Sequence, residues 1–338
     1  MGKVYLLDPT KKDSLSAFRG GGRVIQLIAD YLPEIEFIND PQLIPSDGTL
    51  IVPYWFPFHP PQIIKTKANK KVLIIFDVIP LKYPEHFPIG LKGMIFKWIN
   101  TQIAKSYDKI ITISQSSKKD IKKYLHIDES KISVCYLTIP KTLLKERESK
   151  PNIDIPKTFC LYVGDVNWNK NLPTIAKAIK ENKVPCVFAG GKFSKESVNS
   201  PELKHLWQES FAEFVSLAKD DPRFIFQERV TDSELKWLYK NALCNILVSH
   251  DEGFGLSYLE AATFSTPSIL SDILVFHEIA GDAAIFVNPN DPIRLTQEID
   301  ALSKNPDKRN LLGEKANARS KQLSPNNFAR QFRSALGL

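Results

Sequence analysis

Short apolar runs rich in β-branched residues alternate along the chain with longer segments whose apolar positions recur at helical spacing. This alternation is typical of a parallel sheet covered by helices on both faces. The predicted strands are Val4–Asp8, Thr49–Val52, Val72–Phe76, Lys109–Ser114, Ile132–Tyr136, Thr158–Val163, Pro185–Ala189, Arg223–Gln227, Cys244–Val248, Thr266–Leu270 and Ala284–Val287. The predicted helices are Gly22–Leu32, Ile89–Tyr107, Ser116–Leu125, Leu172–Glu181, Glu202–Leu217, Ser233–Asn241, Leu256–Thr263, Pro292–Lys304 and Pro306–Gln322, followed by a last segment Pro325–Leu338.

The alternation pauses once, between Pro140 and Pro156, where prolines and charged residues leave little to bury. A single hydrophobic core rarely grows beyond about 250–300 residues, so 338 residues favour two domains. We therefore predict an α/β protein with two Rossmann-like, doubly wound domains, residues 1–150 and 151–324. Ligands of such sheets bind outside the carboxyl ends of the strands, which predicts an interdomain cleft as the functional region.

Composition excludes several classes of protein. With 43% hydrophobic and 25% charged residues, the chain is neither disordered nor collagenous. No apolar run approaches the roughly 20 residues of a membrane span, and charged residues come too early for a secretion signal. The four cysteines form no CxxC pair and lie in or beside predicted strands, as reduced core residues do. We expect a soluble cytoplasmic protein.

The basic excess belongs to the first half of the chain. Residues 1–150 hold 23 Lys and Arg against 15 Asp and Glu, a balance of +8. The net charge of the whole chain is +7, so the remaining residues contribute −1. The lysine clusters at 65–71 and 118–123 favour peripheral contact with an anionic membrane surface or an acidic acceptor, or they form solvated helix faces. Nucleic acid is not expected as a partner, because the clusters lack interleaved aromatics and no DNA-reading motif is present.

The segment from Glu252 to Glu260 carries the most specific chemistry. It follows a predicted strand and opens a helix, and Gly253 and Gly255 let backbone N–H groups approach an anion at that helix start. Glu260 lies on the helical face of the first turn, within reach of ribose hydroxyls, and Glu252 projects from the loop toward the group beyond the phosphates. The structural alternative is a helix start with a hydrogen-bonded glutamate.

This Glu-Gly-Phe-Gly-Leu-x-x-x-Glu segment resembles the Glu-x7-Glu signature of the family-4 retaining glycosyltransferases, and most closely a mannosyltransferase-like bacterial subgroup. The resemblance implies the GT-B fold, two facing Rossmann-like domains with a cleft between them, and a final helix at about 325–338 that packs back on the first domain. It also implies retaining transfer of a sugar from a nucleotide-sugar donor, GDP-mannose or a UDP-sugar, to a glycan or lipid-linked acceptor.

Other segments match the same family in order. Tyr162–Leu172 resembles its glycine loop ending in Arg-Lys-Asn-Leu, with Lys170 at the lysine that contacts the donor diphosphate and Asn169 in place of the arginine. Phe188–Lys192 resembles its glycine turn, and Val230–Leu235 its segment under the nucleobase.

The first half carries weaker matches. Phe76–Glu85 resembles the family's His-Asp-Leu-Ile-Pro-Leu segment, with Phe76 in place of the histidine and Asp77 retained. Gly20–Arg23 suits a loop that closes over phosphate, or a structural turn. Ile113–Ser117 matches a turn near the acceptor, or forms a serine cap. The aromatics of Pro53–Pro60 stack on a sugar or pack as core.

Glu252, Lys170 and Asp77 are the residues predicted to carry the reaction. The residues predicted to bind the donor are Gly21, Gly22, Arg23, Gly164, Asn171, Gly190, Val230, Leu235, Gly253, Phe254, Gly255, Leu256, Ser257 and Glu260. The chain contains no Asp-x-Asp triplet, so we expect neither a metal nor another cofactor, with cationic groups stabilising the leaving diphosphate. A non-catalytic nucleotide-sugar binding protein and a nucleotide-sugar epimerase or hydrolase stay open as alternatives. A nicotinamide-dependent oxidoreductase ranks below them, because no Gly-x-Gly-x-x-Gly follows the first strand of either half.

Overall fold

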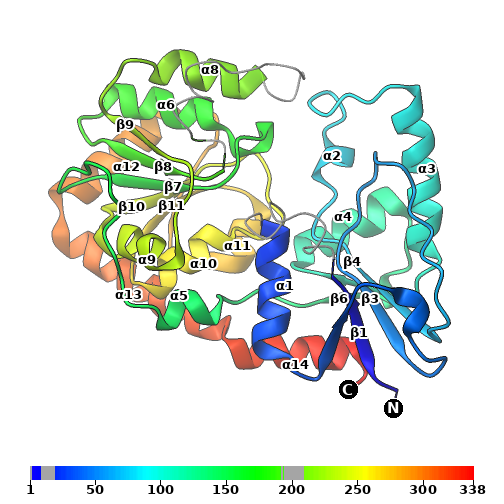
Figure 1. Ribbon diagram of the computed structural model, residues 1–338. Coiled ribbons are helices and arrows are strands. Elements are labelled where there is room, and N and C mark those ends of the chain that lie inside the picture. The colour runs from blue at the N-terminus through cyan, green and yellow to red at the C-terminus, as the bar shows by residue number, and fades with distance from the viewer. Residues whose placement is uncertain (1, 9–19, 192, 194–208) are drawn as a thin grey trace. The chain divides into compact units, whose positions relative to one another are not determined.

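The computed structural model describes residues 2–8, 20–191, 193 and 209–338. The chain forms two compact units, one made of Met1–Pro140 with Leu323–Leu338 and the other of Lys141–Gln322. Each unit contains a six-stranded sheet in which every strand pair is parallel (Figure 1). The predicted α/β class with two doubly wound units is thereby confirmed.

The sheet of the first unit has the order β2-β1-β3-β4-β5-β6. Its strands are β1 (Val4–Leu7), β2 (Ile35–Ile38), β3 (Thr49–Val52), β4 (Lys70–Ile74), β5 (Lys109–Thr112) and β6 (Ile132–Val134). Its helices are α1 (Gly20–Tyr31), α2 (Ile79–Lys82), α3 (Leu91–Lys105), α4 (Gln115–Leu125) and α14 (Pro325–Leu336), with short 3-10 turns at Pro41–Leu43 and Glu129–Lys131. Its central strands β1, β3, β4 and β5 are mostly buried on both faces, which is why they appear in the sequence as nearly continuous apolar runs.

The sheet of the second unit has the order β12-β11-β10-β7-β8-β9. Its strands are β7 (Cys160–Val163), β8 (Cys186–Ala189), β9 (Phe224–Gln227), β10 (Cys244–Leu247), β11 (Ser268–Ser271) and β12 (Ile285–Val287). Its helices are α5 (Lys141–Lys145), α6 (Leu172–Glu181), α8 (Glu209–Ala218), α9 (Asp232–Asn241), α10 (Leu256–Thr263), α11 (Leu274–Ala280), α12 (Pro292–Lys304) and α13 (Pro306–Gln322), with a 3-10 turn at Trp168–Lys170.

Both sheets reverse their strand order beside their first strand. The chain passes from β7 to β8 and β9 on one side, then returns to place β10 on the other side of β7. In the first unit β1 lies between β2 and β3 in the same way. Ligands of open α/β sheets bind at this switch point, outside the carboxyl ends of the strands. Ligands are therefore expected at the turns after β7 and β10 and at those after β1 and β3.

The expected boundary at residues 150 and 151 differs from the observed one by ten residues. Lys141–Lys145 forms α5, which contacts α9 of the second unit: the Thr142 hydroxyl donates to the Asp232 carboxylate. Lys236 Nζ also donates to the carbonyls of Leu144 and Glu146, both at 2.8 Å. Leu143 of α5 is also fully buried in the apolar core cluster of the second unit. The hydrophobic pattern of this charged segment does not show these contacts.

Four short elements have no counterpart in the sequence predictions: β2, α2, α5 and α11. Each spans four to seven residues, which is too short to establish a period of its own. The predicted helix Glu202–Leu217 corresponds to α8, and residues 202–208 lie outside the described part of the chain.

The last helix, α14, belongs to the first unit. Its apolar face includes Phe328, whose ring meets Tyr31 of α1 edge-on at 6.4 Å between centroids. Arg333 forms an ion pair with Glu34 at 2.6 Å, and Lys70 Nζ donates to the carbonyl of Leu336 at 2.7 Å. This helix thus completes the core of the unit that contains the start of the chain.

All four cysteines are free and buried. Within the described residues, every helix falls short of the length and apolar character that crossing a bilayer requires.

Candidate functional site

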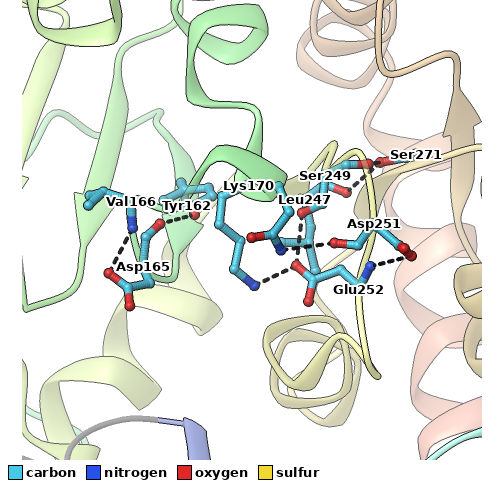
Figure 2. Close-up of polar contacts among 10 residues, drawn as sticks. Tyr162, Asp165, Val166, Lys170, Leu247, Ser249, Asp251, Glu252 and Ser271 are labelled. Carbon is cyan, nitrogen blue, oxygen red and sulfur yellow. Dashed lines mark hydrogen bonds and ion pairs between the residues drawn. The ribbon is translucent and has the colours of Figure 1, made fainter. Parts of the chain in front are cut away.

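Lys170 and Glu252 meet at the switch point of the second sheet. Lys170 follows β7 and Glu252 follows β10, and Lys170 Nζ lies 2.6 Å from Glu252 Oε1. Figure 2 shows the two side chains pointing toward each other from separate segments. The Glu252 side chain is 8% exposed and that of Lys170 20%, so the pair is shielded yet in contact with solvent. Two charged residues that belong to motifs far apart in the sequence therefore form an ion pair in the structure.

Two side chains, Lys170 and Ser249, hold the same oxygen of the Glu252 carboxylate. Its Oε1 also accepts a hydrogen bond from the buried Ser249 hydroxyl at 2.8 Å. Within the described part of the chain, Oε2 receives no hydrogen bond. The carboxylate is therefore held by one oxygen, which leaves the other to accept from a ligand. Burial raises the pKa of the nearby Tyr162 phenol well above its usual value, and the Glu252 carboxylate raises that pKa further.

Asn171 fixes the loop that carries Lys170. It adopts a left-handed conformation, with φ 53°, at the start of α6. Its side-chain amide donates to the carbonyls of Val248 at 2.9 Å and Pro289 at 2.7 Å. Because both amide hydrogens are used on backbone carbonyls, this predicted donor-binding residue joins three loops of the unit through its side chain.

Asn169, which replaces the arginine of the family motif, is buried and joins the two loops of the ion pair. Its side chain donates to the carbonyl of Asp251 at 3.0 Å, and its own carbonyl accepts from the His250 N–H at 2.7 Å. Beside these bonds, the Trp168 and His250 rings stack at 4.7 Å between centroids. The substitution thus removes a cation and supplies a bridge that positions Glu252 relative to Lys170.

Glycines permit close approach of the turns around this pair. A Cβ on Gly190 would lie 2.0 Å from the Gly164 carbonyl oxygen, and a Cβ on Gly164 would lie 2.7 Å from the Tyr162 hydroxyl. Gly255 has φ 92°, in the left-handed region, and a Cβ there would lie 2.6 Å from the Phe276 ring. Three of the predicted glycines are thus required by packing, whatever ligand binds.

Helix α10 begins beside Glu252. Gly255 is its N-cap, and among the residues that the structure describes no side chain caps its first N–H groups. Phe254 is buried in the preceding loop, and Ser257 is buried in the first turn. Uncapped N–H groups and the helix dipole make such a terminus favourable for an anion. Gly253 lies in the same loop as Phe254, and Leu256 is the first residue of the helix.

Glu260, one turn further along α10, is buried and accepts a hydrogen bond from the Tyr239 hydroxyl at 2.8 Å. Tyr239 belongs to α9 and lies in the apolar core cluster that also contains Leu235. Val230, partly buried, packs against the same cluster. Val230 and Leu235 therefore support the helix that holds Tyr239, and Tyr239 in turn orients Glu260.

The predicted residues of the first unit lie at its own switch point. Gly21 is in the first turn of α1 with Gly22 and Arg23, and a Cβ on Gly21 would lie 2.6 Å from the Tyr54 ring. Tyr54 follows β3 and meets the Phe76 ring edge-on at 6.1 Å. The Arg23 guanidinium donates to the Gln26 side chain at 3.1 Å.

Asp77 follows Phe76 after β4. Its Oδ1 accepts from the Ile79 N–H at 3.1 Å, which stabilises the short helix α2. At the next strand end, the Ser114 hydroxyl accepts from the Ser117 N–H at 2.9 Å and caps α4, in agreement with the serine-cap alternative.

The aromatic segment after β3 is partly exposed and firmly anchored. Asn100 of α3 donates through its side chain to the carbonyls of Phe56, Pro57 and His59 at 2.9–3.1 Å. The Trp55 indole donates to the Asn100 carbonyl at 3.1 Å. Phe56 and His59 rings lie 5.2 Å apart, so the row of rings from Phe76 through Tyr54 continues along this segment.

Sequence reasoning missed Ser249, Tyr239 and the bridging role of Asn169. Ser249 stands three residues before Glu252, directly after a strand, and that spacing was a usable signal. Tyr239 gave none, because its contact with Glu260 depends on how α9 and α10 pack. Within the described residues, no cluster of three or more His, Cys, Asp or Glu side chains could hold a metal ion.

Comparison with known proteins identifies the family. Residues 145–319 match the family described as glycosyl transferases group 1. The chain is 27% identical over 255 residues to the O-antigen chain mannosyltransferase RfbU of Salmonella typhimurium, covering 71% of this chain and 62% of that protein. It is 22% identical over 297 residues to O-antigen chain mannosyltransferase B of Escherichia coli, covering 83% of this chain and 74% of that protein. It thus spans less than two thirds of the length of RfbU.

Solved structures share the fold. Anabaena Alr3699/HepE in complex with UDP-glucose aligns over 100% of both chains with a TM-score of 0.71 and 13% identity. Sucrose-phosphate synthase (tll1590) from Thermosynechococcus elongatus aligns over 79% of this chain and 67% of that chain, with a TM-score of 0.63 and 17% identity. These neighbours support a GT-B-type architecture and confirm the predicted fold class. The family match covers the unit with the Lys170–Glu252 pair, and the chain belongs to the glycosyl transferases group 1 family.

Proposed function

We propose that the protein is a metal-independent, retaining glycosyltransferase. It moves a sugar from a nucleotide-sugar donor to a glycan or lipid-linked acceptor. The observation that carries the proposal is the shielded Lys170–Glu252 pair at the switch point of the second sheet, with the uncapped start of α10 beside it. Mannose from GDP-mannose is the preferred donor, because RfbU and mannosyltransferase B are named as mannosyltransferases. The UDP-glucose complex of the HepE neighbour keeps a UDP-sugar as the alternative.

Breaking the sugar–phosphate bond transfers negative charge to the departing nucleoside diphosphate, and this charge must be stabilised. Lys170 supplies one cation and the first N–H groups of α10 supply a second electropositive site. Each such contact is worth on the order of 2–4 kcal/mol of the barrier. Arg23 is a further candidate, on the first unit. Since the sequence has no Asp-x-Asp triplet, we assign this task to these groups and to no metal or other cofactor.

Glu252 faces the sugar in this proposal. Its Oε1 is held by Lys170 and Ser249, so Oε2 can accept from donor-sugar hydroxyls. A carboxylate in this position also favours the positive charge that develops at the anomeric carbon. The acceptor hydroxyl then attacks on the face from which the phosphate departs, and its proton passes to the departing diphosphate oxygen, so that the anomeric configuration is retained. Glu260, oriented by Tyr239, binds ribose hydroxyls.

The acceptor side is assigned to the first unit. Tyr54, Phe56 and Phe76 form a row of rings beside Asp77, and aromatic faces are suited to stacking on sugars. A cytoplasmic location is part of the same proposal, supported by four free, buried cysteines.

A transfer assay tests the proposal. Purified protein is incubated with labelled GDP-mannose or UDP-glucose and an oligosaccharide acceptor, with and without EDTA, and the product is analysed by NMR. We expect a glycoside with the donor's anomeric configuration and an equal rate in EDTA. An inverted product would contradict the retaining mechanism, and loss of the reaction in EDTA would contradict metal independence.

The second candidate is a non-catalytic nucleotide-sugar binding protein. It is favoured by Asn169 and Phe76, which stand where the family carries an arginine and a histidine. Product analysis with donor alone and with donor plus acceptor separates the candidates. A binding protein leaves the donor intact in both, a hydrolase or epimerase consumes it without acceptor, and a transferase needs the acceptor.

A further inference from the structure

Helix α3 of the first unit exposes a stripe of large apolar side chains. Leu91, Met94, Ile95 and Trp98 are 76%, 50%, 57% and 65% exposed, respectively. Their spacing, i, i+3, i+4 and i+7, places all four on one face of the helix. We call these four residues the α3 stripe. A helix on a sheet normally buries its apolar stripe against the core, so this arrangement is the reverse of the usual one.

The opposite face of α3 is fixed to the unit by hydrogen bonds. Asn100 is buried, and its side chain holds the carbonyls of Phe56, Pro57 and His59. Ala104, one turn further on, lies in the core cluster. At about 100° per residue, Asn100 lies roughly opposite Trp98. Since the inner face is anchored in this way, the α3 stripe is held outward; Figure 1 shows α3, in cyan, along an edge of its unit.

The chain segment that carries the α3 stripe is basic. Residues 86–107 hold three lysines, Lys92, Lys97 and Lys105. Lys92 and Lys97 are exposed on α3 itself, and no acidic residue occurs from 86 to 107. Neither lysine pairs with a carboxylate in the described part of the chain. Their charges are thus available to an anionic partner.

Helix α4 provides the contrast within the same unit. The cluster Lys118, Lys119, Lys122 and Lys123 was the more conspicuous one in the sequence. Lys118 and Lys122 both pair with Glu129, at 3.6 and 2.6 Å. Large apolar side chains are also absent from the exposed positions of α4. Unpaired lysines coincide with exposed apolar residues on α3, whereas α4 lacks this combination.

We propose that α3 is a membrane-docking helix that lies in the headgroup region of an anionic lipid bilayer. The α3 stripe enters the boundary with the acyl chains, and Lys92 and Lys97 contact lipid phosphates. An apolar face with a tryptophan and flanking lysines is the composition of an interfacial amphipathic helix. The lysines of residues 86–107, a segment without acidic residues, fit the negative potential of the bilayer surface by charge complementarity. This inference rests on the first unit alone and does not depend on the proposed transferase activity.

Vesicle sedimentation without any donor tests this proposal. The probes are vesicles of phosphatidylcholine alone and of phosphatidylcholine and phosphatidylglycerol in equal parts. We expect the protein to bind the anionic vesicles, and the double variant Ile95→Ser/Trp98→Ser to bind them at least about ten-fold more weakly. Lys92→Gln/Lys97→Gln should weaken binding to anionic vesicles by about ten-fold or more and reduce the preference over neutral ones by the same factor.

The matched control removes equally exposed apolar side chains from the second unit. Ile293 and Leu311 are 68% and 57% exposed, and Ile293→Ser/Leu311→Ser should bind vesicles as the unaltered protein does. Circular dichroism and thermal unfolding confirm that each variant is folded. The proposal is overturned if the unaltered protein stays in the supernatant, or if the α3 variant sediments with the vesicles as strongly as the control. It is also overturned if the α3 stripe instead mediates self-association, seen by equilibrium ultracentrifugation as a dimer that Ile95→Ser/Trp98→Ser dissociates.

Discussion

Both sheets are six-stranded and parallel and reverse their strand order beside their first strand, but the side chains that follow their central strands differ. In the second unit, the turns after β7 and β10 bring together Lys170 and Glu252, held by Asn169, Ser249 and Asn171. In the first unit, the turns after β3 and β4 present the rings of Tyr54 and Phe76. The carboxyl ends of parallel strands thus present charged side chains in one unit and aromatic rings in the other. The strand order indicates where a ligand lies, while the side chains decide which chemistry is possible.

The largest expected effect is that of removing the Glu252 charge. Glu252→Gln should lower kcat by about 10²–10³-fold, because the amide no longer stabilises positive charge at the anomeric carbon. The measurement is steady-state transfer at saturating donor.

Glu298→Gln is the matched control for this variant. The Glu298 side chain is also 8% exposed and is paired with Arg294 and Lys308, within the same unit. It should lose a comparable amount of stability and keep its kcat. Equal losses of kcat in the two variants would show that Glu252 acts only through stability.

A smaller effect is expected from the bridge between the two loops. Asn169→Asp replaces the N–H that donates to the Asp251 carbonyl with a carboxylate oxygen, which repels that carbonyl. We expect kcat to fall by about ten-fold as Glu252 moves relative to Lys170. Asn317→Asp, which also removes a donor to a backbone carbonyl, that of Thr263 at 2.8 Å, should leave kcat unchanged. An unaltered kcat in Asn169→Asp would refute the positioning role.

The contact between Tyr239 and Glu260 should affect binding more than turnover. Tyr239→Phe removes the hydroxyl that donates to Glu260 Oε2, so the donor KM should rise several-fold, equivalent to about 1 kcal/mol, with kcat nearly constant. The control is Tyr258→Phe on the same helix as Glu260. The Tyr258 hydroxyl is buried and has no hydrogen-bond partner among the described residues, so its removal should leave KM unchanged. A change confined to kcat would place Glu260 with the reacting groups instead.

The smallest effect concerns the pH dependence of the first unit. The hydrogen bond from Arg333 holds the pKa of Glu34 below its usual value of 4.5. A lowered pKa contributes stability above pH 4.5, and this stability is lost as the pH falls through the pKa of the folded state. Because both side chains are more than a third exposed, the contribution at neutral pH is at most about 1 kcal/mol.

Thermal unfolding of Arg333→Gln against the unaltered protein at pH 7 and pH 3 measures this contribution. The difference in unfolding free energy should be present at neutral pH and shrink in acid. A difference that grows in acid would contradict the sign.

The sequence is sufficient to predict the fold class, and it predicts that Lys170 and Glu252 follow the ends of strands. It is less informative about contacts between helices. Strands buried on both faces leave apolar runs that are easy to detect, and β-strand ends locate Lys170 and Glu252. The short β2 and α5 carry too few residues to show a period. From the sequence, Asn169 indicates only that the positive charge of the family's arginine is absent. Its hydrogen bond to the Asp251 carbonyl cannot be predicted, because it requires the two loops to be adjacent. The outward orientation of the α3 stripe depends on Asn100, whose contacts no local pattern shows.

Calorimetric titration with nucleoside diphosphates tests most directly whether Lys170 and Glu252 form the donor site. The unaltered protein should bind GDP or UDP, and Lys170→Met should bind at least about ten-fold more weakly, since it loses a charge-assisted contact with phosphate. Lys308→Met, which removes a lysine paired with the buried Glu298, should bind as the unaltered protein does. Equal affinity of the Lys170→Met variant and the unaltered protein, or no binding by the unaltered protein, would contradict the account.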